Sequence, residues 1–379
     1  MASIHARARL RAAACMLAAA FTFLPTAPAA HALPSPRPIQ TAGLGGEAVY
    51  DLVALDSGRV ILGGSFTSVG TYSRANLGAV MANGKADPDF APTVNGPVHA
   101  VAVSEDGSRL FIGGTFTEVN GVPRQNLAAL DPYTGDLVDG WRADTTGTTP
   151  MVSSLAVSGD RLYVGGRFDG IDGSAKQKLA AVDVGTGNLD VWDTWVNGAV
   201  NEVRVRPDGR HVWIGGEFTR IRGSDRPYFG AINAVTGKTT PFAGLGNGSR
   251  VITLALSPNG RWVYTANNAN RVNAYKTDSF APRWSRHTDG NVQAIAGSGT
   301  EVYLGGHYTQ FDDEGTPRMF FAAVNAYSGA MTAWDPLATG TNKGVWSLVL
   351  DGQYLYAGGG FTHFAGVKQR LFAKFDLVP

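Results

Sequence analysis

Polar and aromatic side chains that could bind a ligand recur about once every fifty residues, each in a short run of alternating apolar and polar residues. The position after the first apolar residue of each run varies, and it holds Tyr50, His99, Ser153, Asn201, Ile252, Gln293 and Trp346. The next position holds Asp51, Ala100, Ser154, Glu202, Thr253, Ala294 and Ser347. Aromatic rings can stack on a sugar or a peptide, and amides and carboxylates can hydrogen-bond to it. We therefore predict a ligand-binding site formed by Tyr50, Asp51, His99, Asn201, Glu202, Gln293 and Trp346.

The two carboxylates of this set leave an enzymatic alternative open. Inverting glycoside hydrolases hold two carboxylic acids roughly 6.5–9.5 Å apart. Asp51 and Glu202 come three repeats apart and would face each other across a ring, which we expect to be wider than that separation. A third alternative is that the polar residues only hydrate a channel. The catalytic residues of an enzyme cannot be named from this pattern.

These residues must be positioned by a repeated unit, of which residues 110–121 (LFIGGTFTEVNG) are the clearest copy. Five similar copies begin at Val60, Leu162, Val212, Val302 and Leu355, and a degenerate copy without glycines begins at Trp262. The first glycines of the copies align as Gly63, Gly113, Gly165, Gly215, Gly305 and Gly358, with Thr265 in the degenerate copy. A regular period of this length is typical of solenoids and propellers.

Each unit contains four short strand-like runs, which in the second unit are VHAVAV, LFIGGTF, NLAALD and LVDGWRA. Gly-containing turns such as Glu105-Asp106-Gly107 separate the runs and favour hairpins. No amphipathic helix follows the first 32 residues, so the pattern predicts an all-β chain. Four short strands per unit are typical of propeller blades. The last unit lacks its fourth strand, and residues 38–49 could supply it. We predict a seven-bladed β-propeller over residues 39–379, closed by pairing of the N-terminal strand with the last blade.

Two further features recur in every complete unit. The double glycine should allow a neighbouring segment to approach closely, and the aromatic residue after it should pack between blades. These aromatic residues are Phe66, Phe116, Phe168, Phe218, Tyr308 and Phe361. Basic residues precede the third strand at Arg74, Arg124, Lys176, Arg226, Arg318 and Lys368. They would either attract anions to a common face or bond carbonyls of their own loops.

The N-terminus has the pattern of a secretory signal peptide. Arg7, Arg9 and Arg11 precede an apolar run over residues 12–24, and Ala30-His31-Ala32 is a small-x-small cleavage site. We expect residues 1–32 to be removed and the protein to be secreted, with residues 33–38 as a Pro-rich leader. The apolar run is shorter than the roughly 20 residues that span a membrane, so no membrane span is expected.

The amino-acid composition argues against several other classes of protein. Cys15 is the only cysteine and lies in the signal peptide, so the mature chain would have no disulfide or thiolate metal site. A net charge of +1 with 17% charged residues gives no basic stripe for nucleic acid. The histidines lack metal-ligand spacing, and the acidic loops FDGIDG and FDDEG do not follow the calcium-loop pattern. We expect no metal, no cofactor and a monomer.

Residues 83–130 resemble the delta-60 repeat propellers of exported bacterial proteins, which share the features N-G-x-x-D-x-x-F, G-G-x-F-T and an Asn-Gly turn. The resemblance extends over about residues 39–379 and implies a propeller and export, but no particular activity. The segments ALDPYTGDLVDGW and AVDVGTGNLDVWD are also similar to the tryptophan-docking repeat of pyrroloquinoline-quinone dehydrogenases. Those enzymes typically have eight blades, and many have a vicinal disulfide, whereas this chain has seven units and no mature cysteine.

The functional prediction is therefore an exported propeller that presents a loop-built face at its channel mouth to a polysaccharide or to another exported protein. The alternative is a carbohydrate-active enzyme, a hydrolase or a lyase, with its site at the same mouth.

Overall fold

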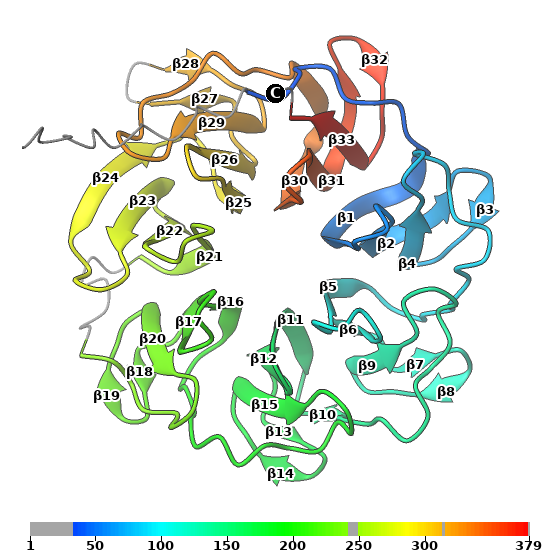
Figure 1. Cartoon of the computed structure of the whole chain (residues 1–379), viewed down its shortest axis with the longest axis vertical. Coiled ribbons are helices and arrows are strands. Elements are labelled where there is room, and N and C mark those ends of the chain that lie inside the picture. Colours follow the sequence, from blue (N-terminus) through cyan, green and yellow to red (C-terminus); the bar gives the residue numbers. More distant parts are fainter. Residues whose placement is uncertain (1–32, 242–248, 313–314, 378–379) are drawn as a thin grey trace, which may run out of the picture. The chain divides into compact units, whose positions relative to one another are not determined.

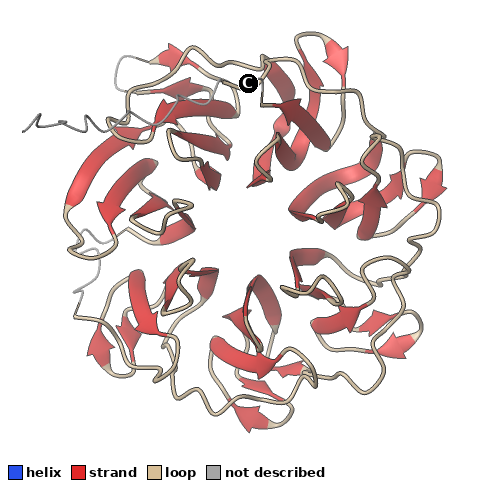
Figure 2. Ribbon diagram, in the orientation of Figure 1, coloured by secondary structure: helices blue, strands red, loops and turns tan. Residues whose placement is uncertain are grey.

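The computed structural model describes residues 33–241, 249–312 and 315–377. The chain divides into two units, Met1–Ala30 and His31–Pro379, and all of the described strands belong to the second. The predicted signal peptide, residues 1–32, lies outside the described residues. Every regular element within the described residues is a β-strand, and these residues contain no helix (Figure 2). The prediction of an all-β chain is confirmed.

The longer strands form seven antiparallel sheets, which we number as main sheets one to seven. Main sheets one to four contain β1 (Leu44–Ala54), β2 (Val60–Val69), β3 (Tyr72–Ser73) and β4 (Leu77–Val80); β5 (Val98–Val103), β6 (Leu110–Gly114) and β9 (Leu127–Leu130); β11 (Met151–Ser158), β12 (Arg161–Arg167) and β15 (Leu179–Asp183); and β16 (Val200–Val205), β17 (His211–Gly216) and β20 (Phe229–Asn233). Main sheets five to seven contain β21 (Val251–Leu256), β22 (Trp262–Asn267), β23 (Arg271–Lys276) and β24 (Pro282–His287); β25 (Val292–Gly297), β26 (Glu301–Gly306) and β29 (Phe321–Asn325); and β30 (Ala338–Leu350), β31 (Tyr354–Phe364), β32 (Val367–Lys368) and β33 (Phe372–Asp376). The main sheets are arranged around a common centre, with the first strand of each sheet innermost (Figure 1).

Small sheets that the sequence did not predict lie mainly in the connections after the second strands, with β10 joining one of them from the segment before β11. They are formed by β7 (Glu118–Val119) with β8 (Val122–Pro123); β10 (Thr145–Thr146), β13 (Gly170–Ile171) and β14 (Ser174–Ala175); β18 (Arg220–Ile221) with β19 (Ser224–Asp225); and β27 (Gln310–Phe311) with β28 (Thr316–Pro317). Main sheet five has no such hairpin among its described residues, since β22 is followed directly by β23. The shorter fifth unit thus lacks this small hairpin.

At six of the seven boundaries between neighbouring main sheets, a valine of one sheet packs on a glycine of the other. The innermost strand of every main sheet carries a buried valine, namely Val49, Val98, Val152, Val200, Val251, Val292 and Val345. A Cβ atom added at Gly113 would lie only 2.4 Å from Cγ1 of Val152 in the next sheet. A Cβ at Gly358 of main sheet seven would likewise lie 2.6 Å from Val49 of main sheet one. The first glycine of the doublet therefore permits the close approach that the sequence predicted.

The predicted alignment of main sheet five was wrong by one residue. In main sheet two, Ala100 pairs with Gly113 and Val98 with Gly114. The corresponding pairs in main sheet five are Thr253 with Ala266 and Val251 with Asn267. Ala266, rather than Thr265, therefore occupies the position of the first glycine. Without glycines to mark this position, the register could be read only from the strand pairing.

The fourth strand is shorter than predicted in most main sheets. Residues 137–143 were expected to form a strand, but only Leu137 makes a bridge, to Leu130 of β9. The segment then leaves the ladder and buries Trp141, whose indole N–H donates a hydrogen bond to the carbonyl of Val184 in main sheet three at 3.1 Å. A complete fourth strand, β24, is present in main sheet five.

In main sheet seven, the outermost position is occupied by the beginning of the described chain. Ile39 forms an antiparallel bridge with Lys374 of β33, and the Ile39 amide donates to the Lys374 carbonyl at 2.7 Å. The Ser35 amide donates to the Asp376 carbonyl at 2.9 Å. The predicted pairing segment, residues 38–49, is thus divided: Ile39 contacts main sheet seven, whereas residues from Leu44 onward belong to β1.

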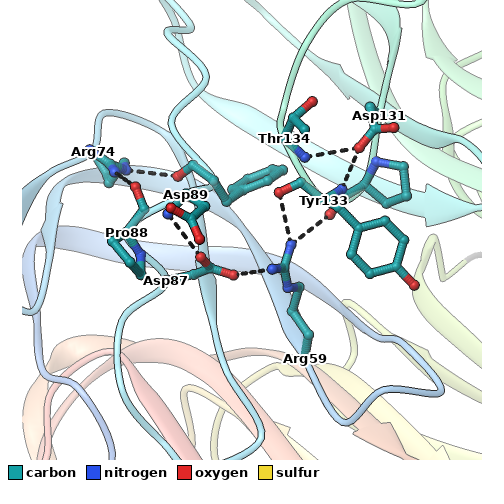
Figure 3. Close-up of polar contacts among 10 residues, drawn as sticks. Arg59, Arg74, Asp87, Pro88, Asp89, Asp131, Tyr133 and Thr134 are labelled. Carbon is teal, nitrogen blue, oxygen red and sulfur yellow. Dashed lines mark hydrogen bonds and ion pairs between the residues drawn. The ribbon is translucent and has the colours of Figure 1, made fainter.

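Charged side chains also connect successive main sheets (Figure 3). The Arg59 guanidinium forms an ion pair with Asp87 of its own sheet and donates to the carbonyls of Pro132 and Tyr133 at 3.2 and 3.0 Å. These two carbonyls lie in the turn after β9 of main sheet two. The guanidinium also lies 5.1 Å from the centre of the Tyr133 ring. Because Asp87 and Arg59 are largely buried, this clamp is protected from solvent screening.

The recurrent basic residues mainly bind their own loops. Arg74 donates to the carbonyls of Phe90 and Pro88 at 2.8 and 2.9 Å, as Figure 3 shows. Lys176 donates to the Trp192 carbonyl at 3.0 Å. Of the two alternatives raised by the sequence, these contacts favour the structural one, in which each basic residue fixes its own loop.

Candidate functional site

The innermost strands line a cavity of about 660 Å³. All seven predicted site residues line it: Tyr50, Asp51, His99, Asn201, Glu202, Gln293 and Trp346. Each of the seven main sheets contributes at least one lining residue. These residues share one space, and their role in ligand binding stays a prediction.

The cavity-facing residue of each innermost strand is the extra residue of a β-bulge. In main sheet two, Val98 pairs with Gly114 and Ala100 with Gly113, so His99 between them has no partner on β6. The same shift in register occurs in all seven main sheets, at Tyr50, His99, Ser153, Asn201, Ile252, Gln293 and Trp346. A bulge bends the strand and redirects the side chain of the extra residue. The bulges explain why these variable side chains point into one space.

One side of the cavity is aromatic. The rings of Tyr50 and His99 stack at 4.9 Å with an interplanar angle of 10°, and Trp346 meets Tyr50 edge-on at 5.5 Å. His307 contacts the other side of Trp346 at 5.3 Å. Burial lowers the pKa of His99 below its ordinary value of 6.5, so this ring is neutral at neutral pH. Tyr50, His99 and Trp346, from main sheets one, two and seven, line the cavity together, whereas His307 contacts Trp346 without being a lining residue.

The opposite side carries charged residues that were missing from the predicted set. Arg167, Glu217 and Asn268 line the cavity from main sheets three, four and five, and Arg250 lies just before β21. Arg167 Nη2 lies 3.3 Å from Glu217 Oε1, and Arg250 Nη1 lies 3.8 Å from the same oxygen. The sequence did contain a signal for two of them, since Arg167 and Glu217 both occupy the variable position of the G-G-x-F motif.

The two predicted carboxylates, Asp51 and Glu202, each link neighbouring main sheets. Asp51 accepts hydrogen bonds from the Ser347 hydroxyl of main sheet seven at 3.0 Å and from the Val101 amide of main sheet two at 2.9 Å. Glu202 accepts from the hydroxyls of Ser154 and Thr253 at 2.8 and 3.2 Å, which belong to main sheets three and five. Each carboxylate therefore connects its own sheet to both neighbours.

The electrostatic environments of the two carboxylates differ. Glu202 Oε1 lies 2.6 Å from Arg204 Nη1. Asp51 is surrounded by protein, and this loss of solvation raises the pKa of Asp51 from 3.8 to about 6. The hydrogen bond from Val101 and the charge of Arg204 oppose the rise, whereas the nearby Glu202 charge contributes to it. Asp51 is thus the cavity carboxyl whose protonation changes near neutral pH.

The described residues contain no group of three or more His, Cys, Asp or Glu side chains placed to hold a metal ion. His363 Nδ1 is hydrogen-bonded to the Thr362 hydroxyl at 2.9 Å. No helix among the described residues has the length and apolar character needed to cross a membrane.

Comparison with known proteins identifies a fold but no family. No protein-family model matches the chain, and no curated protein matches it. Among solved structures, the chain is similar to a chain of the "Crystal Structure of Mitotic Checkpoint Complex", with a TM-score of 0.64 and 15% sequence identity. The match covers 97% of this chain and 98% of that chain. At this identity the likeness shows the fold alone, and the chain is an all-β protein of β-propeller-like architecture.

Proposed function

We propose that residues 39–379 form a seven-bladed propeller in which the N-terminal segment completes the last blade. The Ile39–Lys374 bridge, the packing of Val49 on Gly358 and the Asp51–Ser347 hydrogen bond all support this closure. The substitution Ile39→Pro would remove the amide that donates to Lys374. It should lower the free energy of unfolding by about 1–2 kcal/mol. Unchanged stability in urea denaturation would count against closure, with Ile39→Ala, which keeps the amide at the same exposed position, as the control.

We propose further that the protein is an exported binding module of the delta-60 repeat type, whose central cavity receives a polysaccharide or an exported protein. The observation that carries this proposal is the convergence of seven bulge residues, one from each main sheet, on one cavity. Residues that differ in every repeat, yet share one orientation, fit recognition of an irregular ligand. The signal-peptide pattern at residues 1–32 supports export.

A binding role accounts better for the two carboxylates than catalysis does. Both oxygens of Asp51 and both oxygens of Glu202 accept hydrogen bonds from neighbouring sheets. A catalytic pair would need oxygens directed at a substrate.

One observation nevertheless favours a second candidate, a carbohydrate-active hydrolase or lyase. The pKa of Asp51 is raised to about 6, which is suitable for a general acid near neutral pH. This candidate predicts cleavage of a bound polysaccharide and its loss in Asp51→Asn.

The test is a screen of glycans and exported proteins with the secreted protein, followed by affinity measurements on Trp346→Ala and His99→Ala. We expect each variant to bind at least tenfold more weakly, because each loses part of the aromatic surface. Trp195→Ala is the matched control, since Trp195 is a partly exposed tryptophan that does not line the cavity. Full affinity in both cavity variants would exclude the cavity as the binding site. Hydrolysis and lyase assays on the same ligands separate the enzymatic candidate.

A further inference from the structure

The charged groups of the cavity are distributed unequally between its surface and its wall. The side chains of Arg167, Arg204 and Arg250 are 53%, 42% and 57% exposed. The Glu202 side chain is only 14% exposed, and its oxygens are bonded to Ser154 and Thr253. Asp51 is partly buried, and its oxygens are likewise bonded to neighbouring sheets. The surface that a ligand would meet is therefore more positive than the formal charge of the lining residues.

Two of these guanidinium groups have donors to spare. Among the described residues, the Arg167 guanidinium makes one hydrogen bond, to Glu217, and Arg250 approaches the same carboxylate only as an ion pair at 3.8 Å. A guanidinium has five N–H donors arranged to match a carboxylate. A single glutamate between two arginines leaves both an excess positive charge and unused donors on this side of the cavity.

The remaining lining favours hydroxyl groups over apolar side chains. Asn268, Asn291 and Gln293 also line the cavity, and each of their side-chain amides has both a hydrogen-bond donor and an acceptor. A sugar hydroxyl can donate to one group and accept from another, which a peptide's apolar side chains cannot do. The stacked Tyr50 and His99 rings and Trp346 offer faces for the C–H surface of a sugar ring.

We infer that the ligand is an acidic glycan, a chain of sugar rings that carry carboxylates. It would lie across the cavity with a ring against Tyr50 and Trp346 and a carboxylate against Arg167 and Arg250. This inference rests on the proposed binding function and narrows its ligand to one chemical class.

The experiment compares short oligosaccharides of galacturonic, glucuronic and mannuronic acid with their methyl esters, by calorimetry on the secreted protein. Methyl esterification removes the charge and keeps the sugar ring. At least one acid should bind about tenfold more tightly than its ester, and Arg167→Gln and Arg250→Gln should each remove most of this difference. Arg220→Gln should leave this difference unchanged. The Arg220 side chain is similarly exposed, at 58%, but it pairs with Asp225 and does not line the cavity. Trp346→Ala should weaken the binding of both acid and ester.

The outcomes separate this inference from the proposed function. Equal affinity for acid and ester, or intact discrimination in both arginine variants, would overturn the preference for acidic sugars while leaving glycan binding in place. Equal competition by an oligoglutamate peptide would overturn the choice of glycan over peptide. Binding of none of the sugars in either form would overturn the inference outright. The proposed function fails only if its own ligand screen finds no ligand whose binding depends on Trp346 or His99.

Discussion

The bulge residue and the residue that follows it on each innermost strand are neighbours in sequence but differ in almost every physical respect. The bulge residues are half-buried and chemically diverse, and most of them have no role in joining sheets. In main sheets two and six the following position holds a small buried alanine, Ala100 or Ala294. In the other five main sheets it holds Asp51, Ser154, Glu202, Thr253 and Ser347, which hydrogen-bond across sheet boundaries. The position that faces the cavity and the position that joins the sheets are thus adjacent, so one can vary without weakening the other.

The largest effect should follow from removing a carboxylate at the second position. Glu202→Ala would delete bonds to Ser154 and Thr253 and leave Arg204 without its partner. We expect the free energy of unfolding to fall by about 2–4 kcal/mol in urea denaturation. The control is Ser153→Ala at a bulge position, which should change it by less than about 0.5 kcal/mol. Similar losses in the two variants would contradict the division of roles.

A smaller and pH-dependent effect should follow from Asp51→Asn. The pKa of Asp51 is about 6 in the folded protein and close to 3.8 when unfolded, so the folded state binds the proton more tightly. The contribution of Asp51 to stability is therefore present below about pH 4 and is lost as the pH rises through 6. Asp51→Asn should be more stable than the parent protein by about 2 kcal/mol at pH 7.5, with no such gain at pH 4. The check is a comparison of urea denaturation curves at the two pH values, and a gain that does not change with pH would refute the raised pKa.

The smallest effect should distinguish the one bulge residue that bonds a neighbouring sheet. The Asn201 amide donates to the Val251 carbonyl of main sheet five at 2.8 Å, although Asn201 also lines the cavity. We expect Asn201→Ala to lower the free energy of unfolding by about 1 kcal/mol. The same substitution should weaken ligand binding. Loss of binding with no change in the denaturation midpoint would show that Asn201, like the other bulge residues, does not help to hold the sheets together.

The sequence predicted the composition of the cavity wall well, because its residues recur with the period of the repeat. It could not predict the bulges, since an extra residue becomes visible only when two strands are paired, as Val98 and Ala100 are with consecutive glycines. It misplaced main sheet five because that unit replaces the glycines with Ala266 and Asn267. It also overlooked Arg250, which lies outside a strand and has no recurrent type at its position. The variable residue of G-G-x-F, in contrast, was available as a signal for Arg167 and Glu217.

The repeated pairing of a buried valine with a neighbouring glycine has a practical consequence for engineering. Since this contact sets the spacing between sheets without using the bulge side chain, the bulge positions other than Asn201 can be exchanged one at a time on a fixed framework. A combinatorial library restricted to those codons would sample many cavity surfaces with little loss of melting temperature.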